Sequence, residues 1–164
     1  MSNQTLQGGL AGLQFVTDIV TLLKNKWVVD NGGEKPTFFK SWEFKEAGLG
    51  DNKYAVVVVS IDTENPQIFS LLQGSSGSLG SNYDWLHEVS VTLDVRTSIS
   101  EFRVLQMTNE IMRILKANVV PITKDVNQTL YIQWLPDGGA TSMNEEYRGI
   151  YRYLISVSCQ IFNP

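Results

Sequence analysis

The stretch from Trp85 to Asn118 constrains the fold more than any other part of the chain. Its first half, WLHEVSVTLDVRT, alternates in a way typical of a half-buried β-strand. The second half changes to a helical period with a broad apolar face, and Ser98 and Glu101 have the spacing of a capping box, so a helix is expected to begin there. The inward strand residues are Trp85, His87, Val89, Val91, Leu93 and Val95, and the apolar helix residues are Phe102, Val104, Leu105, Met107, Ile111, Met112, Ile114 and Leu115.

The size and charge of the chain narrow the class of protein. Its 164 residues can bury one sizeable core, and we expect a single domain over residues 1–164. The net charge of -4, without a basic cluster, argues against general binding to nucleic-acid phosphates. A single cysteine, the lack of a recognisable secretory signal and a polar-interrupted apolar run at residues 10–23 predict a protein of the reducing cytoplasm with no membrane segment.

Two further elements are expected before the central strand. Apolar residues at three- and four-residue steps predict a helix that ends at the glycines following Asn31. The aromatic segment at residues 35–53 either forms a short strand or lies across the edge of the core. The β-branched run at residues 54–61 predicts a strand covered on both faces. The apolar stripe of the first helix is Leu13, Val16, Val20, Leu23 and Trp27.

The rest of the chain completes an α+β pattern. Residues 73–82 are rich in glycine and serine and predict a flexible loop, which lacks the lysine and hydroxyl of a phosphate-binding P-loop. A strand is expected at residues 129–135, a flexible turn-rich excursion at 136–146 and an alternating last strand at 148–162. We therefore expect one α+β domain, in which a mixed or antiparallel sheet carries two main helices on one face.

The sequence predicts no catalytic, metal or cofactor site. His87 has no cysteine or second histidine in a zinc-binding pattern, and a structural or interface role is favoured. Cys159 lies on the apolar side of the last strand, where a thiol behaves as a small hydrophobic group. No nucleophile elbow supports a hydrolase.

The polar sides of the strands carry the most informative charges. These charges form either a solvated face with local ion pairs or a polar contact between subunits, in which arginine and tyrosine are favoured. The candidate interface residues are Glu88, Asp94 and Arg96 on the central strand, Asp137, Glu145 and Glu146 on the excursion, and Arg148 and Arg152 on the last strand.

Two segments together resemble a known family. The stretch YDWLHEVSVTLDVRTSISEFRVLQMTNEIMRIL, followed by NEEYRGIYRYLISVSCQIFNP, is similar to the neck or tail terminator proteins of tailed bacteriophages. In that family a strand feeds a helix, and a turn-rich excursion leads into an arginine-bearing last strand. The resemblance covers mainly the C-terminal half of the chain.

The resemblance implies a non-enzymatic virion protein, assembled in the host cytoplasm. Such proteins form a homo-oligomeric ring, commonly six-fold, on the last ring of the tail tube protein, where they stop tube growth and contact the head–tail connector protein. Genomic DNA then passes through the lumen without specific binding, and mild acidity suits such a passage. The alternative is a tail tube protein or another head–tail connector protein, and a small-molecule enzyme is a more distant one.

Overall fold

The computed structural model describes residues 11–49, 53–68, 85–118, 130–144 and 148–163. Side chains are described for these residues except 11, 14, 64–68, 85–87, 130–139 and 159–163. The elements, in chain order, are α1 (Ala11–Lys26), α2 (Val29–Gly32), β1 (Thr37–Lys40), the 3-10 turns η2 (Ser41–Glu43) and η3 (Glu46–Leu49), β2 (Ala55–Ile68), β3 (Trp85–Thr97), α3 (Glu101–Ala117), β4 (Leu130–Ser142) and β5 (Tyr151–Asn163).

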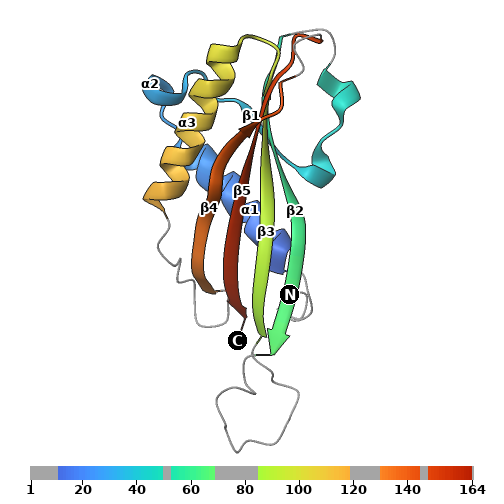
Figure 1. Ribbon diagram of the computed structural model, residues 1–164, viewed down its shortest axis with the longest axis vertical. Coiled ribbons are helices and arrows are strands. Elements are labelled where there is room, and N and C mark those ends of the chain that lie inside the picture. Colours follow the sequence, from blue (N-terminus) through green and yellow to red (C-terminus); the bar gives the residue numbers. More distant parts are fainter. Residues whose placement is uncertain (1–10, 50–52, 69–84, 119–129, 145–147, 164) are drawn as a thin grey trace, which may run out of the picture.

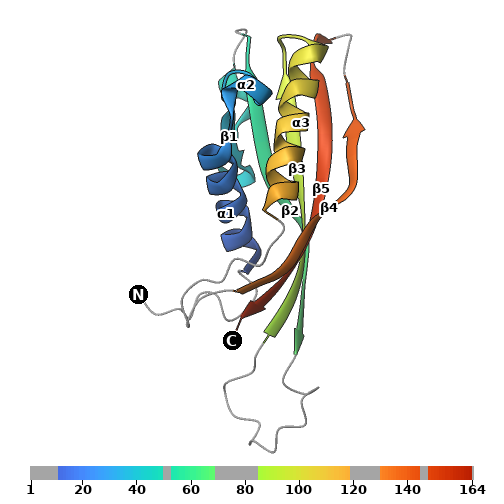
Figure 2. The same ribbon diagram turned by 90° about the vertical axis from the view of Figure 1, so that its left-hand side faces the viewer.

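A five-stranded sheet of order β1-β2-β3-β5-β4 forms one layer of the fold. The short β1 runs parallel to β2, and every other neighbouring pair is antiparallel, so the sheet is mixed. The two long helices, α1 and α3, pack on one face of this sheet (Figures 1 and 2). The α+β class with two main helices on one face is therefore confirmed. None of the helices in the described ranges is both long and apolar enough to span a bilayer.

The core lies between the helices and the inward face of the sheet. Alternate residues of β3 from Val89 to Val95 are buried, as the alternation predicted. The α1 stripe is also buried except for Leu13, which is 39% exposed, and on α3 Phe102 and Leu105 are exposed at the margin of the helical face. The buried core residues are Phe15, Val16, Ile19, Val20, Leu23, Trp27, Phe38, Val57, Val59, Val89, Val91, Leu93, Val95, Val104, Met107, Ile111, Ile114, Leu115, Ile155 and Val157.

The start of β2 is covered on both faces. Val57 and Val59 belong to the helix-side core, while Val56 and Val58 are buried on the opposite face. In register, Val58 lies between Phe39 of β1 and Asp94 of β3. The continuous β-branched run thus matches a strand that has no solvated side.

The capping box predicted at Ser98 and Glu101 is wrong. Ser100 caps α3, because its Oγ accepts a hydrogen bond from the Arg103 backbone N–H at 3.1 Å. Ser98 instead joins the end of β3 to the start of β2: its Oγ accepts from Tyr54 N at 3.0 Å and its N–H donates to Tyr54 O at 3.1 Å. The chain therefore needs two more residues to leave the sheet before the helix begins.

The observed ends of the first helix and of the fourth strand also differ from the predicted ones. The first helix ends at Lys26, and the glycines after Asn31 end the separate short helix α2, with Gly33 at φ 68°. The strand expected at residues 129–135 continues to Ser142, so the predicted excursion is wrong up to that residue. An irregularity between Asp137 and Ala140 absorbs the two glycines without ending the pairing with β5. The predicted loop at 73–82 and residues 145–147 lie outside the described residues.

Candidate functional site

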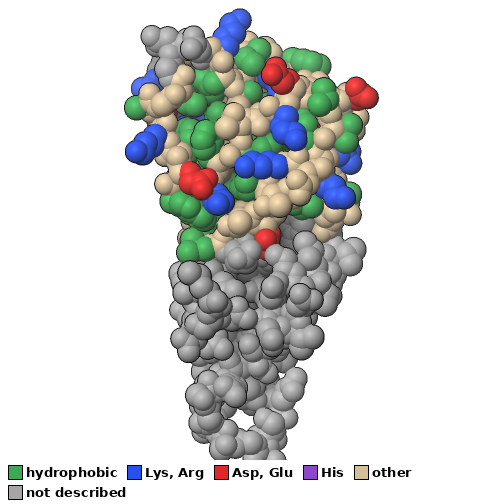
Figure 3. All heavy atoms as spheres, turned by 180° about the vertical axis from the view of Figure 1, so that it is seen from behind, with side chains coloured by type: hydrophobic (Ala, Val, Ile, Leu, Met, Phe, Trp, Pro, Cys, Tyr) green, Lys and Arg blue, Asp and Glu red, His purple; other side chains and the backbone are tan. Residues whose placement is uncertain are grey.

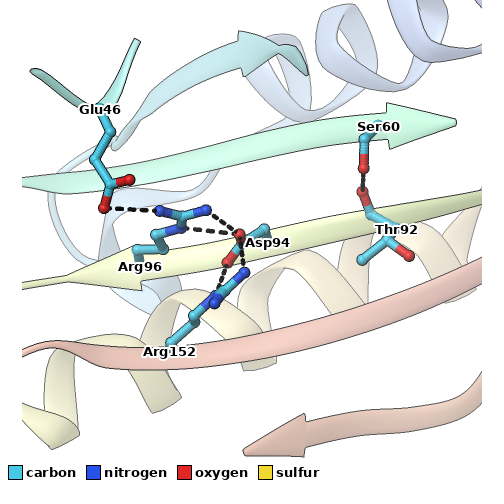
Figure 4. A network of polar contacts seen from close by, with 6 residues as sticks. All are labelled: Glu46, Ser60, Thr92, Asp94, Arg96 and Arg152. Atoms are coloured by element: carbon cyan, nitrogen blue, oxygen red, sulfur yellow. Dashed lines mark hydrogen bonds and ion pairs between the residues drawn. The ribbon is translucent and has the colours of Figure 1, made fainter. Parts of the chain in front are cut away.

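Three of the predicted interface residues meet on the outer face of the sheet, the face opposite the helices (Figure 4). Asp94 and Arg96 are two residues apart on β3, so they project to the same side, away from the buried Val95. Arg152 of β5 lies directly opposite Arg96 in the antiparallel register. The two arginines are thus held side by side by strand pairing, with a carboxylate beside them. We call Asp94, Arg96 and Arg152 the outer-face ion cluster.

The Asp94 carboxylate binds both guanidinium groups. Its Oδ2 accepts from Arg96 Nε at 2.8 Å and Nη2 at 2.6 Å. Arg152 donates from Nε to Oδ1 and from Nη2 to Oδ2, both at 2.8 Å. The Asp94 side chain is only 10% exposed, and hydrogen bonds between charged groups are stronger than neutral ones. The two oxygens of this carboxylate thus accept four hydrogen bonds, all from the guanidinium groups of Arg96 and Arg152.

Arg96 is further held by the segment that follows β1. Its Nη1 lies 3.6 Å from Glu46 Oε1, and its guanidinium lies 5.3 Å from the ring centroid of Phe44. The Phe44 ring packs against Phe39 of β1 at 5.4 Å between centroids. The Glu46 side chain is 70% exposed, so solvent screens its contribution, and the aromatic contact is the better support. The contact of Glu46 was not predicted, because residues 41–49 show neither the alternation of a strand nor a long helical period.

A row of hydroxyl groups crosses the sheet next to the cluster. Ser60, Thr92 and Ser156 are register partners on β2, β3 and β5. Ser60 Oγ donates to the Thr92 carbonyl at 3.4 Å (Figure 4). Thr92 Oγ1 in turn donates to the carboxylate of Asp62. The outer face is therefore polar but carries no described basic side chain in this row.

The other predicted interface residues are not brought into the cluster by any described contact. Glu88 is exposed further along the same face of β3, with Ser90 and Thr92 between it and Asp94. Arg148 is exposed in the turn before β5. Asp137 pairs with Ser156 through the backbone of β4, but its side chain is not described, and Glu145 and Glu146 lie outside the described residues.

Figure 3 shows the opposite face, formed by the helices, on which Lys and Arg side chains lie among apolar and a few acidic ones. Lys35 Nζ donates to the Lys24 carbonyl at 2.8 Å, which brings two lysines together at the end of α1. The exposed basic residues around these helices are Lys24, Lys26, Lys35, Arg113 and Lys116. Basic side chains thus gather on the helix face, and one of them, Arg113, binds a carboxylate, that of Glu110.

A second buried polar group ties α2 to α3. Glu110 of α3 is 2% exposed, and its Oε1 accepts from Val28 N at 2.9 Å and from Arg113 Nη2 at 2.6 Å. The hydrogen bond from Arg113 lowers the pKa of Glu110, against burial, which raises it. Arg103, seven residues earlier and therefore on the same side of α3, donates to the carbonyls of Gly32 and Glu34. This buried role was not predicted, because a glutamate and an arginine at helical spacing look like a solvated pair.

The chemistry available to these groups is that of charge pairing. Among the side chains that the structure describes, no group of three or more histidine, cysteine, aspartate and glutamate residues is arranged to hold a metal ion. The side chains of His87 and Cys159 are outside that set, so the predictions for them stay predictions.

The scan against models of protein families found no match, and the search of curated proteins found no significant similarity.

Proposed function

We propose that this chain is a non-enzymatic structural protein of a tailed bacteriophage virion. In this proposal it forms a homo-oligomeric ring, six-fold, at the head-proximal end of the tail tube. The ring stops polymerisation of the tube protein and joins the tail to the head–tail connector protein. Assembly takes place in the host cytoplasm, and the finished ring belongs to the neck of the virion.

The arrangement of the two segments that resemble tail terminator proteins carries this proposal. Residues 83–115 and 144–164 are separated in the sequence, yet β3 and β5, which they contain, are paired without a break from Trp85 with Asn163 to Thr97 with Tyr151. The helix α3 of the first segment packs against both strands. The residues that carry the resemblance therefore form one continuous unit of the fold rather than two unrelated patches.

The outer face of the sheet suits a passage for DNA. Both arginines of the outer-face ion cluster are already bound to Asp94, so they are poorly placed to bind phosphates. The charged side chains described on or beside this face also include the carboxylates of Glu46, Asp62 and Glu88, and the exposed Arg148 lies in the turn before β5. A surface of hydroxyl groups, on which a carboxylate already binds two of the arginines, attracts phosphates only weakly and lets DNA move through the lumen without specific binding.

A tail tube protein, or another head–tail connector protein, is the second candidate. Among the described residues the sheet ends in strands with an unpaired edge, and such edges fit a tube subunit as well as a terminator subunit. Two long helices on one face of a five-stranded sheet favour the terminator, because tube subunits usually rely on a large barrel-like sheet with one helix.

Imaging and mass measurement test the proposal directly. Purified protein, examined by negative-stain electron microscopy and light scattering, is expected to form closed rings that bind one end of purified tail tubes and limit their growth. Long tubes made by the protein alone would support the tube protein instead. Dispersed monomers that neither cap tubes nor change their length would overturn the proposed function.

A further inference from the structure

The sheet has two edges without a partner among the described residues. The four residues of β1 pair only with residues 56–59 of β2, so residues 60–68 of β2 are paired on the β3 side alone. At the other side of the sheet, β4 pairs with β5 and with no further described strand. The two edges lie at opposite margins of the sheet (Figure 1).

The β4 edge lacks two of the usual protections against pairing with another chain. Exposed edge strands are commonly blunted by short length, by lysine, by proline or by bulges. The 13 residues of β4 include Leu130, Tyr131, Ile132, Trp134 and Leu135 but no lysine or arginine. Pro136 and two register irregularities interrupt this edge, and Pro66 and the irregularity at Asp62 interrupt the edge of β2. These interruptions favour a partner strand in one particular register over indiscriminate aggregation.

The strand directions make the two edges compatible with each other. Each step from β2 to β3, from β3 to β5 and from β5 to β4 is antiparallel, so β2 and β4 run in opposite directions. A rotation about an axis parallel to the strands keeps every strand direction. Such a rotation brings β4 of one copy beside β2 of the next copy in the antiparallel arrangement that the inner strand pairs already have.

We propose that β4 of one copy pairs with residues 60–68 of β2 in the adjacent copy, so that the sheet continues from subunit to subunit. This contact uses two different surfaces of the chain, which is the kind of interface that closes into a ring when the rotation permits. The segment of β2 is about 30 Å long at the usual rise per strand residue, and Pro66 and the irregularity at Asp62 divide the ladder that it can form. The proposal rests on the proposed ring and goes further by naming its contact.

Cysteine cross-linking of the full-length protein tests this contact. In a Cys159→Ala background, Gln133→Cys on β4 is combined in turn with Thr63→Cys, Asn65→Cys or Gln67→Cys on β2. Gln133 is the register partner of Gln160, which in turn pairs with Glu88 of β3. The three β2 positions are the register partners of Ser90, Glu88 and Leu86. All four positions therefore belong to the outer side of the sheet. Each single-cysteine variant is the matched control. Circular dichroism and light scattering confirm that every variant folds and associates as the parent does.

The expected result is that at least one double variant gives, on mild oxidation, a ladder of covalent species above the dimer, whereas the single variants stay monomeric on a non-reducing gel. A dimer from Gln133→Cys alone would show that β4 pairs with another β4, which overturns the proposal. Closed rings that form no cross-link in any combination would overturn the strand contact and leave the ring intact. Monomers at all concentrations would overturn the ring and the contact together.

Discussion

Arg96 and Arg152 lie directly opposite each other on β3 and β5, and both guanidinium groups bind the carboxylate of Asp94. Like charges directly opposite each other on paired strands are destabilising. The single carboxylate between them, which is 10% exposed, attracts both guanidinium groups and offsets their repulsion. The centre of the outer face therefore depends on one aspartate.

Asp94→Asn is expected to lower the free energy of unfolding by about 1.5–3 kcal/mol, because an amide loses the charge that holds both arginines. Urea denaturation with an unchanged m-value measures this loss. Asp62→Asn is the matched control, since the Asp62 carboxylate accepts from the neutral Thr92 hydroxyl, and its effect is expected to be within about 0.5 kcal/mol. Equal effects of the two substitutions would contradict the role given to Asp94.

Ser100→Ala is expected to cost about 0.5–2 kcal/mol, because α3 loses the side-chain acceptor for the Arg103 N–H. Ser100→Asp retains an acceptor at the cap and is expected to recover most of the loss. Thermal unfolding followed by circular dichroism compares the two variants. Similar midpoints for alanine and aspartate would show that this position does not cap the helix.

The stability of the protein is expected to fall with acidification partly through Glu110. Its folded pKa lies below the unfolded value of about 4.3, so its contribution is complete above that value and is lost as the pH falls through the folded pKa. Glu110→Gln is therefore expected to destabilise the protein at pH 7, by an amount that shrinks towards pH 3. Urea denaturation between pH 3 and pH 7 measures the free energy of unfolding of the parent protein and of the Glu110→Gln variant. A difference that does not depend on pH would contradict the assignment.

Gly32→Ala is expected to destabilise the protein by about 1–3 kcal/mol through overpacking. A Cβ at this position would lie 2.5 Å from the Trp27 ring and 2.7 Å from Glu110 Cγ, inside the contact between α2 and α3. Gly48→Ala is the control, because a Cβ there meets no described atom within 4 Å. Denaturation midpoints that match for the two variants would show that the α2–α3 contact yields easily.

Periodicity predicted the parts of the fold in which one face is buried. The alternation from Val89 to Val95 and the helical apolar stripe around Met107 and Ile111 are both in the core, because a shift of either pattern would expose several large side chains. Boundaries were predicted less well. Ser98 has the right spacing for a cap, but its hydrogen bonds go to Tyr54 of another strand, which no local pattern reveals.

The candidate site was predictable in part for the same reason. Alternation placed Asp94 and Arg96 on one side of β3, and Arg152 on the polar side of β5. Their meeting depends on the register between two strands separated by α3 and β4, and a one-residue shift would have moved Arg152 to the core side. Sequence spacing does not determine this register. The buried role of Glu110 was missed because its partner, the Val28 N–H, comes from a distant segment.

Charge reversal separates a folding role from an assembly role on the outer face. Arg152 donates two hydrogen bonds to Asp94, so Arg152→Glu removes both and places a second carboxylate there. Unfolding in urea is expected to become easier by about 2–4 kcal/mol. Glu88→Lys changes an exposed position, where stability is expected to stay within about 0.5 kcal/mol. If Glu88 lies at a subunit contact, light scattering will show weaker association of this folded variant, because a mismatched interfacial charge is costly. Full stability of the Arg152→Glu variant would contradict the folding role given to Arg152.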